Sequence, residues 1–168
     1  EAAPTRLQAL IMFIRVLGEE EQALAWSGTT PFKDIEKGSQ AEHYVGYAYE
    51  KGYTNGYTAT SFKPAGAVNA YQYTEFVLRA MGYSSAANKD LSDTLLRAVN
   101  AGVLTDGDAA MLQSAAFLRA QLVYISYYAL EADLPDGSQS LADRLMDLGV
   151  FTRDEWRGSR QLVKRERR

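Results

Sequence analysis

The chain has 168 residues, of which 46% are hydrophobic and 23% are charged, a composition typical of one compact domain or two small ones. It contains no cysteine, which excludes disulfides, thiolate metal sites and cysteine nucleophiles. The formal net charge of −3 is uneven, because residues 153–168 carry a net +4 and the remainder a net −7. We interpret this basic tail as a solvated helix end, with binding to nucleic acid, an anionic polymer or lipid headgroups as the alternatives.

Tyrosine is the unusual component, with 11 residues against 6 Phe and 2 Trp. Rings with polar tips suit carbohydrate or protein recognition, and they also suit the wet edges of a small core. The longest apolar run, residues 9–14, is far too short to span a bilayer. The chain starts at Glu1 without a visible signal peptide, so we expect a processed product or a piece of a longer protein.

Two kinds of helical segment recur in chain order. The first kind has apolar residues at helical spacing and covers residues 5–18, 69–82 and 118–131. Its second position is occupied in turn by Arg6, Ala70 and Arg119. Thr5 and Asn69 are good N-terminal caps, and Gly18 and Gly82 are good helix stops, so the pattern predicts three amphipathic helices.

The second kind of segment ends in a glycine followed by an apolar or aromatic residue. It covers residues 41–52, 91–102 and 141–149. The clearest copy is followed by a loop in which Asn55 and Gly56 predict a turn and Pro64 ends regular structure. Three helices of each kind predict an all-α fold, in which three helix-loop-helix repeats form a pseudo-threefold bundle closed by pairing the two chain ends.

Several motifs, in the right order, resemble those of the S-layer homology family. Residues 31–35 resemble its Phe-x-Asp opening, 44–52 its first helix, 55–57 with 62–64 its glycine-containing loop ending in Phe-x-Pro, and 5–8 and 118–121 the Thr-Arg-Ala-Glu start of its second helix. The likeness is strong over residues 31–83, good over 3–18, weaker over 90–132 and faint beyond 140.

The resemblance implies a division of the chain into modules. The expected parts are the second half of a first module (1–30), a second and best-matching module (31–83), a degenerate third module (84–135), and a C-terminal helix with a basic tail (136–168). The C-terminal helix is expected to pair with the N-terminal one.

The resemblance also implies a function and a site. The family anchors exported proteins to the cell wall of Gram-positive bacteria by binding secondary cell wall polymer, often capped by a pyruvylated sugar. Carried over to this sequence, Arg6 and Arg119 would offer guanidinium groups to an anionic glycan. Asp34 would support the site or accept sugar hydroxyls, Gly56 would let the backbone approach closely, and Tyr57 and Phe62 would form an apolar wall.

Departures from the family pattern keep an alternative open. Ala70 stands where the middle module should carry arginine, and the usual glutamate is replaced by Gln8, Gln72 and Gln121. The third module also lacks the Phe-x-Asp opening. The alternative is a module for protein–protein interaction or S-layer self-assembly that uses the same fold with degenerate glycan sites.

Catalysis is not expected. His43 is the only histidine, and neither a phosphate-binding loop nor a nucleophile elbow occurs. Asp106-Gly107-Asp108 lacks the rest of a calcium-loop signature, and Asp90, Asp93 and residues 19–21 are expected to be solvated. We therefore expect a secreted wall protein with no cofactor, no metal, no nucleic acid partner and no membrane span.

Overall fold

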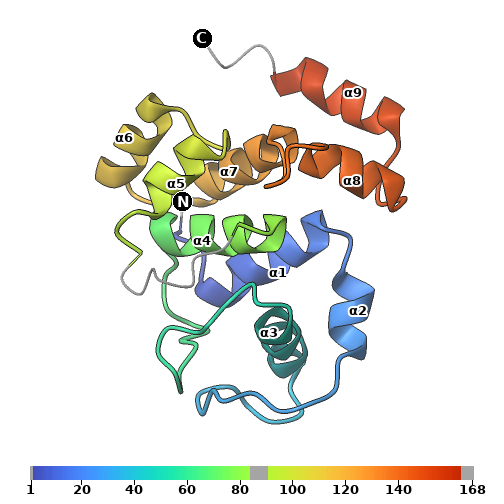
Figure 1. Ribbon diagram of the computed structural model, residues 1–168. Helices are drawn as coiled ribbons and strands as arrows, with labels where there is room; N and C mark the ends of the chain where they lie inside the picture. The colour runs from blue at the N-terminus through green and yellow to red at the C-terminus, as the bar shows by residue number, and fades with distance from the viewer. Residues whose placement is uncertain (1, 84–90, 164–168) are drawn as a thin grey trace.

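The computed structural model describes residues 2–83 and 91–163, so Asp90 and the last five residues of the basic tail lie outside the described part. The helices in it are α1 (Arg6–Val16), α2 (Glu20–Ala25), α3 (Gln40–Glu50), α4 (Ala70–Met81), α5 (Thr94–Asn100), α6 (Asp106–Ser114), α7 (Arg119–Glu131), α8 (Leu141–Asp147) and α9 (Arg153–Val163). Within these residues no strand forms, and sheet-like pairing is limited to isolated bridges. The prediction of an all-α fold is confirmed (Figure 1).

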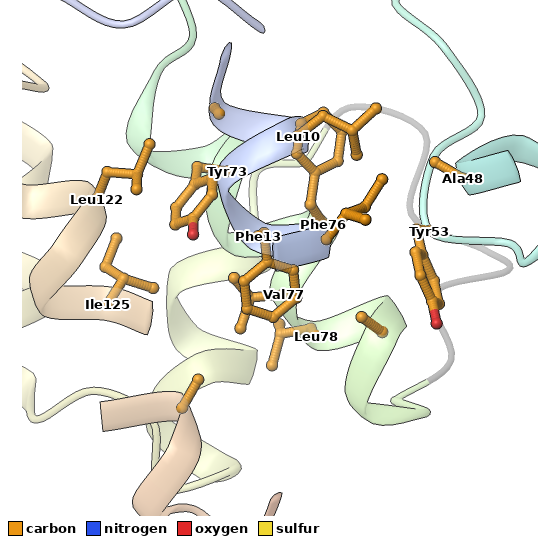
Figure 2. Packing of buried hydrophobic residues seen from close by; sticks show 14 of the residues in the cluster. Leu10, Phe13, Ala48, Tyr53, Tyr73, Phe76, Val77, Leu78, Leu122 and Ile125 are labelled. Carbon is orange, nitrogen blue, oxygen red and sulfur yellow. The ribbon is translucent and has the colours of Figure 1, made fainter. Parts of the chain in front are cut away.

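The three helices of the first kind, α1, α4 and α7, pack against one another at the centre. Tyr73 of α4 is fully buried there, and its ring meets Phe13 of α1 edge-on with centroids 6.0 Å apart. The Tyr73 hydroxyl shares a hydrogen bond with Ser126 of α7. Figure 2 shows Tyr73 lying between Phe13 and the α7 side chains Leu122 and Ile125. One tyrosine therefore joins all three central helices.

The helices of the second kind pack outside this centre. α3 contacts α1, α5 contacts α4, and α8 contacts α7. Each ends at a glycine with positive φ, as the sequence predicted, namely Gly52 (76°), Gly102 (77°) and Gly149 (76°). These contacts are equivalent in the three repeats, which supports a threefold relation between them. The pseudo-threefold arrangement itself stays a prediction.

The first and last repeats of the chain are in contact at Gly18 and Val150. A Cβ atom added to Gly18 would lie 2.7 Å from Cγ2 of Val150, so the turn after α1 meets the turn after α8 closely. Pairing of α8 with α1 along their lengths stays a prediction.

Helices α2 and α6 were not predicted from the sequence. α2 begins in an acidic run that was expected to be solvated; Glu19 and Glu20 are partly exposed and also accept hydrogen bonds from tyrosines. Glu19 accepts hydrogen bonds from Tyr47 (2.8 Å) and Tyr53 (2.8 and 3.0 Å). Glu20 accepts one from Tyr44 (2.5 Å), so α2 is held to α3 by phenol–carboxylate contacts.

A buried threonine in α4 gives the first testable prediction. Thr74 is fully buried, and its hydroxyl is the one buried side-chain polar atom without a partner in the described part of the chain. Thr74→Val should raise the free energy of unfolding by about 1 kcal/mol in urea denaturation, because an unpaired buried hydroxyl is costly. Thr94→Val is the matched control and should lower stability, because the Thr94 hydroxyl donates to Glu75 (3.0 Å). A loss of stability in Thr74→Val would contradict the prediction.

Candidate functional site

The start of α1 is fixed against the segment that follows the 54–64 loop. The Arg6 amide donates to the Gly66 carbonyl (2.8 Å), and the Val68 amide donates to the Pro4 carbonyl (3.0 Å). Thr5 caps α1 through a reciprocal pair of hydrogen bonds with Gln8. A helix start from one end of the chain is thereby placed beside a loop more than forty residues further along the sequence.

Arg6 lies in a stack of aromatic rings and is only 3% exposed. Its guanidinium carbon is 4.8 Å from the ring centroid of Phe62, 5.5 Å from Phe76 and 5.7 Å from Tyr57. Its Nε donates a hydrogen bond to the Phe62 carbonyl at 2.7 Å. Cation–π contacts of this kind orient a guanidinium without neutralising it.

The outer nitrogens of Arg6 remain available. Within residues 2–83 and 91–163, Nε alone of its side-chain nitrogens has a hydrogen-bond partner. The two Nη atoms are not among the buried atoms that lack a partner, so they still reach solvent. Burial lowers the pKa of Arg6 to about 10, against the opposing effects of Tyr57 and Asp34. Arg6 therefore keeps its charge at neutral pH, and its two Nη groups have no hydrogen-bond partner among the described residues.

Asp34 anchors the loop that lines Arg6. Its carboxylate accepts hydrogen bonds from the amides of Phe62 (2.9 Å) and Lys63 (2.7 Å). Partial burial raises the pKa of Asp34, but these backbone hydrogen bonds and the charge of Arg6 outweigh it and leave the pKa below its ordinary value. The geometry makes Asp34 a support for the loop.

This anchor predicts an acid-sensitive loop. The lowered pKa means that Asp34 stabilises the fold above the ordinary carboxyl pKa of 3.8 and that this contribution is lost as the pH falls through the lowered value. Asp34→Asn should lower the free energy of unfolding at pH 7 by about 1 kcal/mol, because solvent can partly replace the exposed carboxylate. Urea titrations should show the gap between variant and wild type closing below pH 3.8. A gap that stays constant with pH would show that the charge of Asp34 has no part in it.

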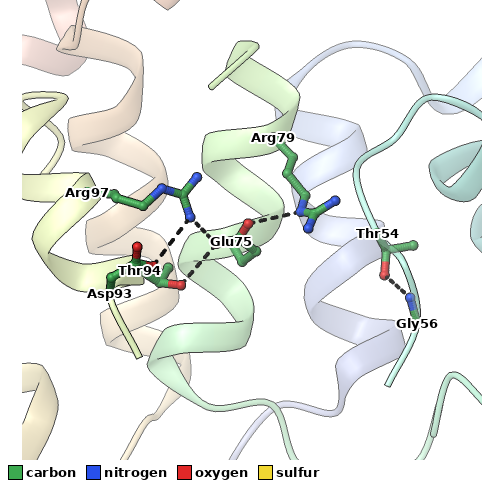
Figure 3. A network of polar contacts seen from close by, with 7 residues as sticks. All are labelled: Thr54, Gly56, Glu75, Arg79, Asp93, Thr94 and Arg97. Carbon is green, nitrogen blue, oxygen red and sulfur yellow. Dashed lines mark hydrogen bonds and ion pairs between the residues drawn. The ribbon is translucent and has the colours of Figure 1, made fainter. Parts of the chain in front are cut away.

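Gly56 allows the loop to pass close to an aromatic side chain. It has a φ of +86°, and a Cβ there would lie 2.2 Å from the ring of Phe32 and 2.7 Å from the Thr58 carbonyl. Its amide is held by the Thr54 hydroxyl at 3.0 Å (Figure 3). Both the left-handed backbone and the close approach require glycine.

Tyr57 and Lys63 form the outer part of the site. Tyr57 is 49% exposed, and Lys63 Nζ lies 3.8 Å from its ring centroid. The sequence pointed to Tyr57 but did not assign Lys63 to the site, although Lys63 occupies the variable position of the Phe-x-Pro motif. Phe76 of α4 was also missed, since nothing in its local sequence distinguishes it from a core residue.

Five of the six predicted site residues therefore lie together. We call Arg6, Asp34, Gly56, Tyr57 and Phe62 the Arg6 cluster. Arg119 lies apart from it. It is exposed and makes no hydrogen bond or ion pair with any described residue. At the equivalent place in α4, Ala70 is buried (3% exposed) and contributes no charge.

A buried charge network centred on Glu75 contacts the loop through Asn55. Glu75 of α4 is 4% exposed and accepts hydrogen bonds from Arg79 (3.0 Å) and Arg97 (2.9 Å), as Figure 3 shows. In the amide orientation that satisfies both its oxygen and its nitrogen, Asn55 accepts a hydrogen bond from Arg79 Nη1 at 3.0 Å. The network thus connects α5, α4 and the loop of the Arg6 cluster.

The residues considered for other chemistry have structural partners. His43 Nδ1 is 2.6 Å from the carbonyl of Trp26, which joins α3 to the segment after α2. Asp108 caps α6 through a reciprocal pair with Thr105, so the Asp-Gly-Asp sequence is a helix start. None of the helices in the described ranges is long and apolar enough to cross a membrane.

Comparison with known families identifies the segment that contains the loop. Residues 31–69 match the family model of the S-layer homology domain. Residues 31–69 form an S-layer homology domain region. The matched stretch contains four residues of the Arg6 cluster, while Arg6 itself comes from the preceding helix. No curated protein and no solved structure matches the chain. S-layer homology domains are non-catalytic modules that anchor proteins to the cell wall and bind wall polymers, which implies association with the cell surface.

Proposed function

We propose that this chain anchors its protein outside the cell by binding an anionic secondary cell wall polymer at the Arg6 cluster. The observation that carries the proposal is Arg6, a cation fixed by Nε and three aromatic rings with both Nη atoms reaching solvent. A planar fork of this kind matches a carboxylate, such as that of a pyruvylated sugar, with two parallel hydrogen bonds.

The residues around Arg6 suit the rest of a sugar ligand. Tyr57 offers a half-exposed ring at the rim of the site, and Lys63 places a second cation over that ring. The carboxylate of Asp34 is occupied by two backbone amides, so its contribution is to hold the loop in place. Preorganisation of the loop lowers the entropy cost of binding.

The proposed site lies between modules. Arg6 belongs to the module half at 1–30, and the loop belongs to the module at 31–83. The module at 84–135 has α6 where the loop is expected, and Ala70 stands at the register position of Arg6, so we assign no polymer site there. A ligand role for Arg119 stays a prediction, because among the described residues nothing beside it corresponds to the loop residues that surround Arg6.

Retention on purified sacculi tests the proposal. The chain should sediment with peptidoglycan sacculi that carry their polymer and should remain in solution after the polymer has been chemically stripped. Lys63→Ala should weaken retention less than Arg6→Ala, since Lys63 is on the rim. Equal retention on stripped sacculi, or none on intact sacculi, would defeat the proposal.

The alternative function is protein–protein interaction or S-layer self-assembly. The buried Ala70 and the replacement of a loop by α6 favour it, because they leave one module without polymer-binding chemistry. Light scattering would support this function if the mass rose with protein concentration while sacculi failed to retain the chain. A constant monomer mass would argue against it.

A further inference from the structure

The loop of the Arg6 cluster is held differently along its length. Asp34 anchors the C-terminal end through two backbone amides, and the tip is closed by a hydrogen bond from the Tyr57 amide to the Ser61 carbonyl (2.8 Å). Residues 54–56, at the N-terminal end, make no backbone–backbone hydrogen bond to any described residue. A side-chain contact is therefore needed to tie this end to the rest of the fold.

Arg79 of α4 supplies that contact. The side-chain oxygen of Asn55 accepts hydrogen bonds from both outer nitrogens of Arg79, Nη1 at 3.0 Å and Nη2 at 3.2 Å. Arg79 follows Phe76 by three residues, so the two side chains share a face of the helix. The Phe76 ring lies 5.5 Å from the guanidinium carbon of Arg6. One face of α4 thus contacts both the cation of the site and the start of its loop.

The direction in which Arg79 donates is fixed from the other side by the buried Glu75. Nε of Arg79 donates to one oxygen of Glu75 at 3.0 Å, and Thr94 and Arg97 of α5 donate to the other at 3.0 and 2.9 Å. Figure 3 shows Arg79 between Glu75 and the loop. Because a guanidinium is planar, the hydrogen bond from Nε also orients the two Nη atoms. Contacts of α4 and α5 therefore set the position of Arg79 independently of the loop.

The segment that begins at Asn55 leads directly to the ring beside Arg6. Gly56 has a φ of +86°, and the next residue, Tyr57, places its ring centroid 5.7 Å from the guanidinium carbon of Arg6. Glycine has more backbone freedom than any other residue, so the chain can change direction at Gly56 unless the residue before it is held. Asn55 is exposed and its own φ is not positive, so its side chain can be removed without straining the backbone.

We infer that Asn55 and Arg79 are positioning residues for the polymer site. Arg79 holds the side-chain amide of Asn55, and this contact sets the direction of the chain at Gly56. The Tyr57 ring is thereby kept in place beside Arg6. A loop fixed in this way need not be ordered when a ligand binds, which lowers the entropy cost of binding. The role in polymer binding rests on the proposed function, whereas the fixing of the loop is a property of the free chain.

Amide hydrogen exchange of the free ¹⁵N-labelled chain, followed by NMR, tests the fixing of the loop. Asn55→Ala should speed exchange at the amides of Gly56 and Tyr57 about fivefold, the effect of losing one net hydrogen bond, while amides in the middle of α1 keep their rates. Asn55→Asp keeps an acceptor for Arg79 and should restore the wild-type rates. Gln22→Ala is the matched control, because it removes an exposed polar side chain from α2, and it should change none of them.

Isothermal titration calorimetry with released wall polymer tests the role in binding. Asn55→Ala should weaken the affinity about fivefold, and Gln22→Ala should leave it unchanged. Arg79→Gln should weaken the affinity as well. The double variant should bind no more weakly than the weaker of the two single variants, because both substitutions break the same contact.

Two results would overturn the inference. Wild-type exchange rates at Gly56 and Tyr57 in Asn55→Ala would show that the contact does not fix the loop, whether or not polymer binds. A loss of affinity from Asn55→Ala that persists in full in the Arg79→Gln background would make Asn55 a direct contact of the polymer. Faster exchange in Asn55→Ala, together with no polymer binding by the wild-type chain, would support the positioning role and refute the proposed function, so the two failures are distinguishable.

Discussion

Arg6→Ala should reduce the affinity of the chain for released secondary cell wall polymer by at least about thirtyfold, measured by isothermal titration calorimetry. Loss of one partner from a desolvated charged hydrogen-bond pair costs about 2–5 kcal/mol, and each 1.4 kcal/mol is about tenfold in affinity. In the described part of the chain, Arg6 is the only cation that lies over three aromatic rings, those of Tyr57, Phe62 and Phe76.

Two further variants separate binding from folding at this position. Arg6→Ala also removes the hydrogen bond from Nε to the Phe62 carbonyl, so thermal unfolding should be followed by circular dichroism. Arg6→Lys keeps the charge but loses the planar fork, and it should bind more weakly than wild type and more tightly than Arg6→Ala. Lys63→Ala should reduce the affinity for the polymer less than Arg6→Ala does. Wild-type affinity in a folded Arg6→Ala variant would contradict the account.

Glu75→Gln should be the most destabilising of the proposed substitutions, with a loss of about 3 kcal/mol in the free energy of unfolding in urea. Glu75 is 4% exposed and accepts from Arg79, Arg97 and Thr94 at 2.9–3.0 Å. An amide cannot neutralise two guanidinium groups, so the variant leaves both cations in a partly desolvated place without their shared counter-charge.

The control for Glu75 is an ion pair at the surface. Arg157 lies 3.5 Å from Asp154 on α9, and both side chains are mostly exposed. Arg157→Ala should therefore have little effect in the same urea titration, because solvent screens such pairs. A Glu75→Gln variant as stable as the Arg157→Ala variant would show that the buried network does not hold α4 to α5.

The sequence was sufficient to predict the helices that carry local signals. Thr5 and Asn69 cap α1 and α4 as expected, and Gly52 ends its helix with positive φ. The same approach missed α6, because repeat register predicted a loop there, whereas Thr105 and Asp108 cap a new helix. Local capping chemistry was present but was given less weight than the repeat.

The candidate site could be predicted only in part, since its contacts join distant segments. The resemblance placed Arg6 and the loop residues in one site, and the structure brings them together. It also placed Arg119 with them because of its register. The register describes α7 correctly, but the surroundings of Arg119 depend on the chain after α8, which becomes α9. No local pattern predicted that Glu75 would accept hydrogen bonds from two arginines.

The most direct test of the central claim follows the arginine side chains of the folded chain by ¹⁵N NMR while released wall polymer is added. The account predicts that the Nε and Nη resonances of Arg6 shift and saturate with polymer concentration, because the two Nη atoms donate to the ligand. The Arg157 resonances should stay in place as an internal reference. Saturation of polymer binding with no change at Arg6 would contradict the claim.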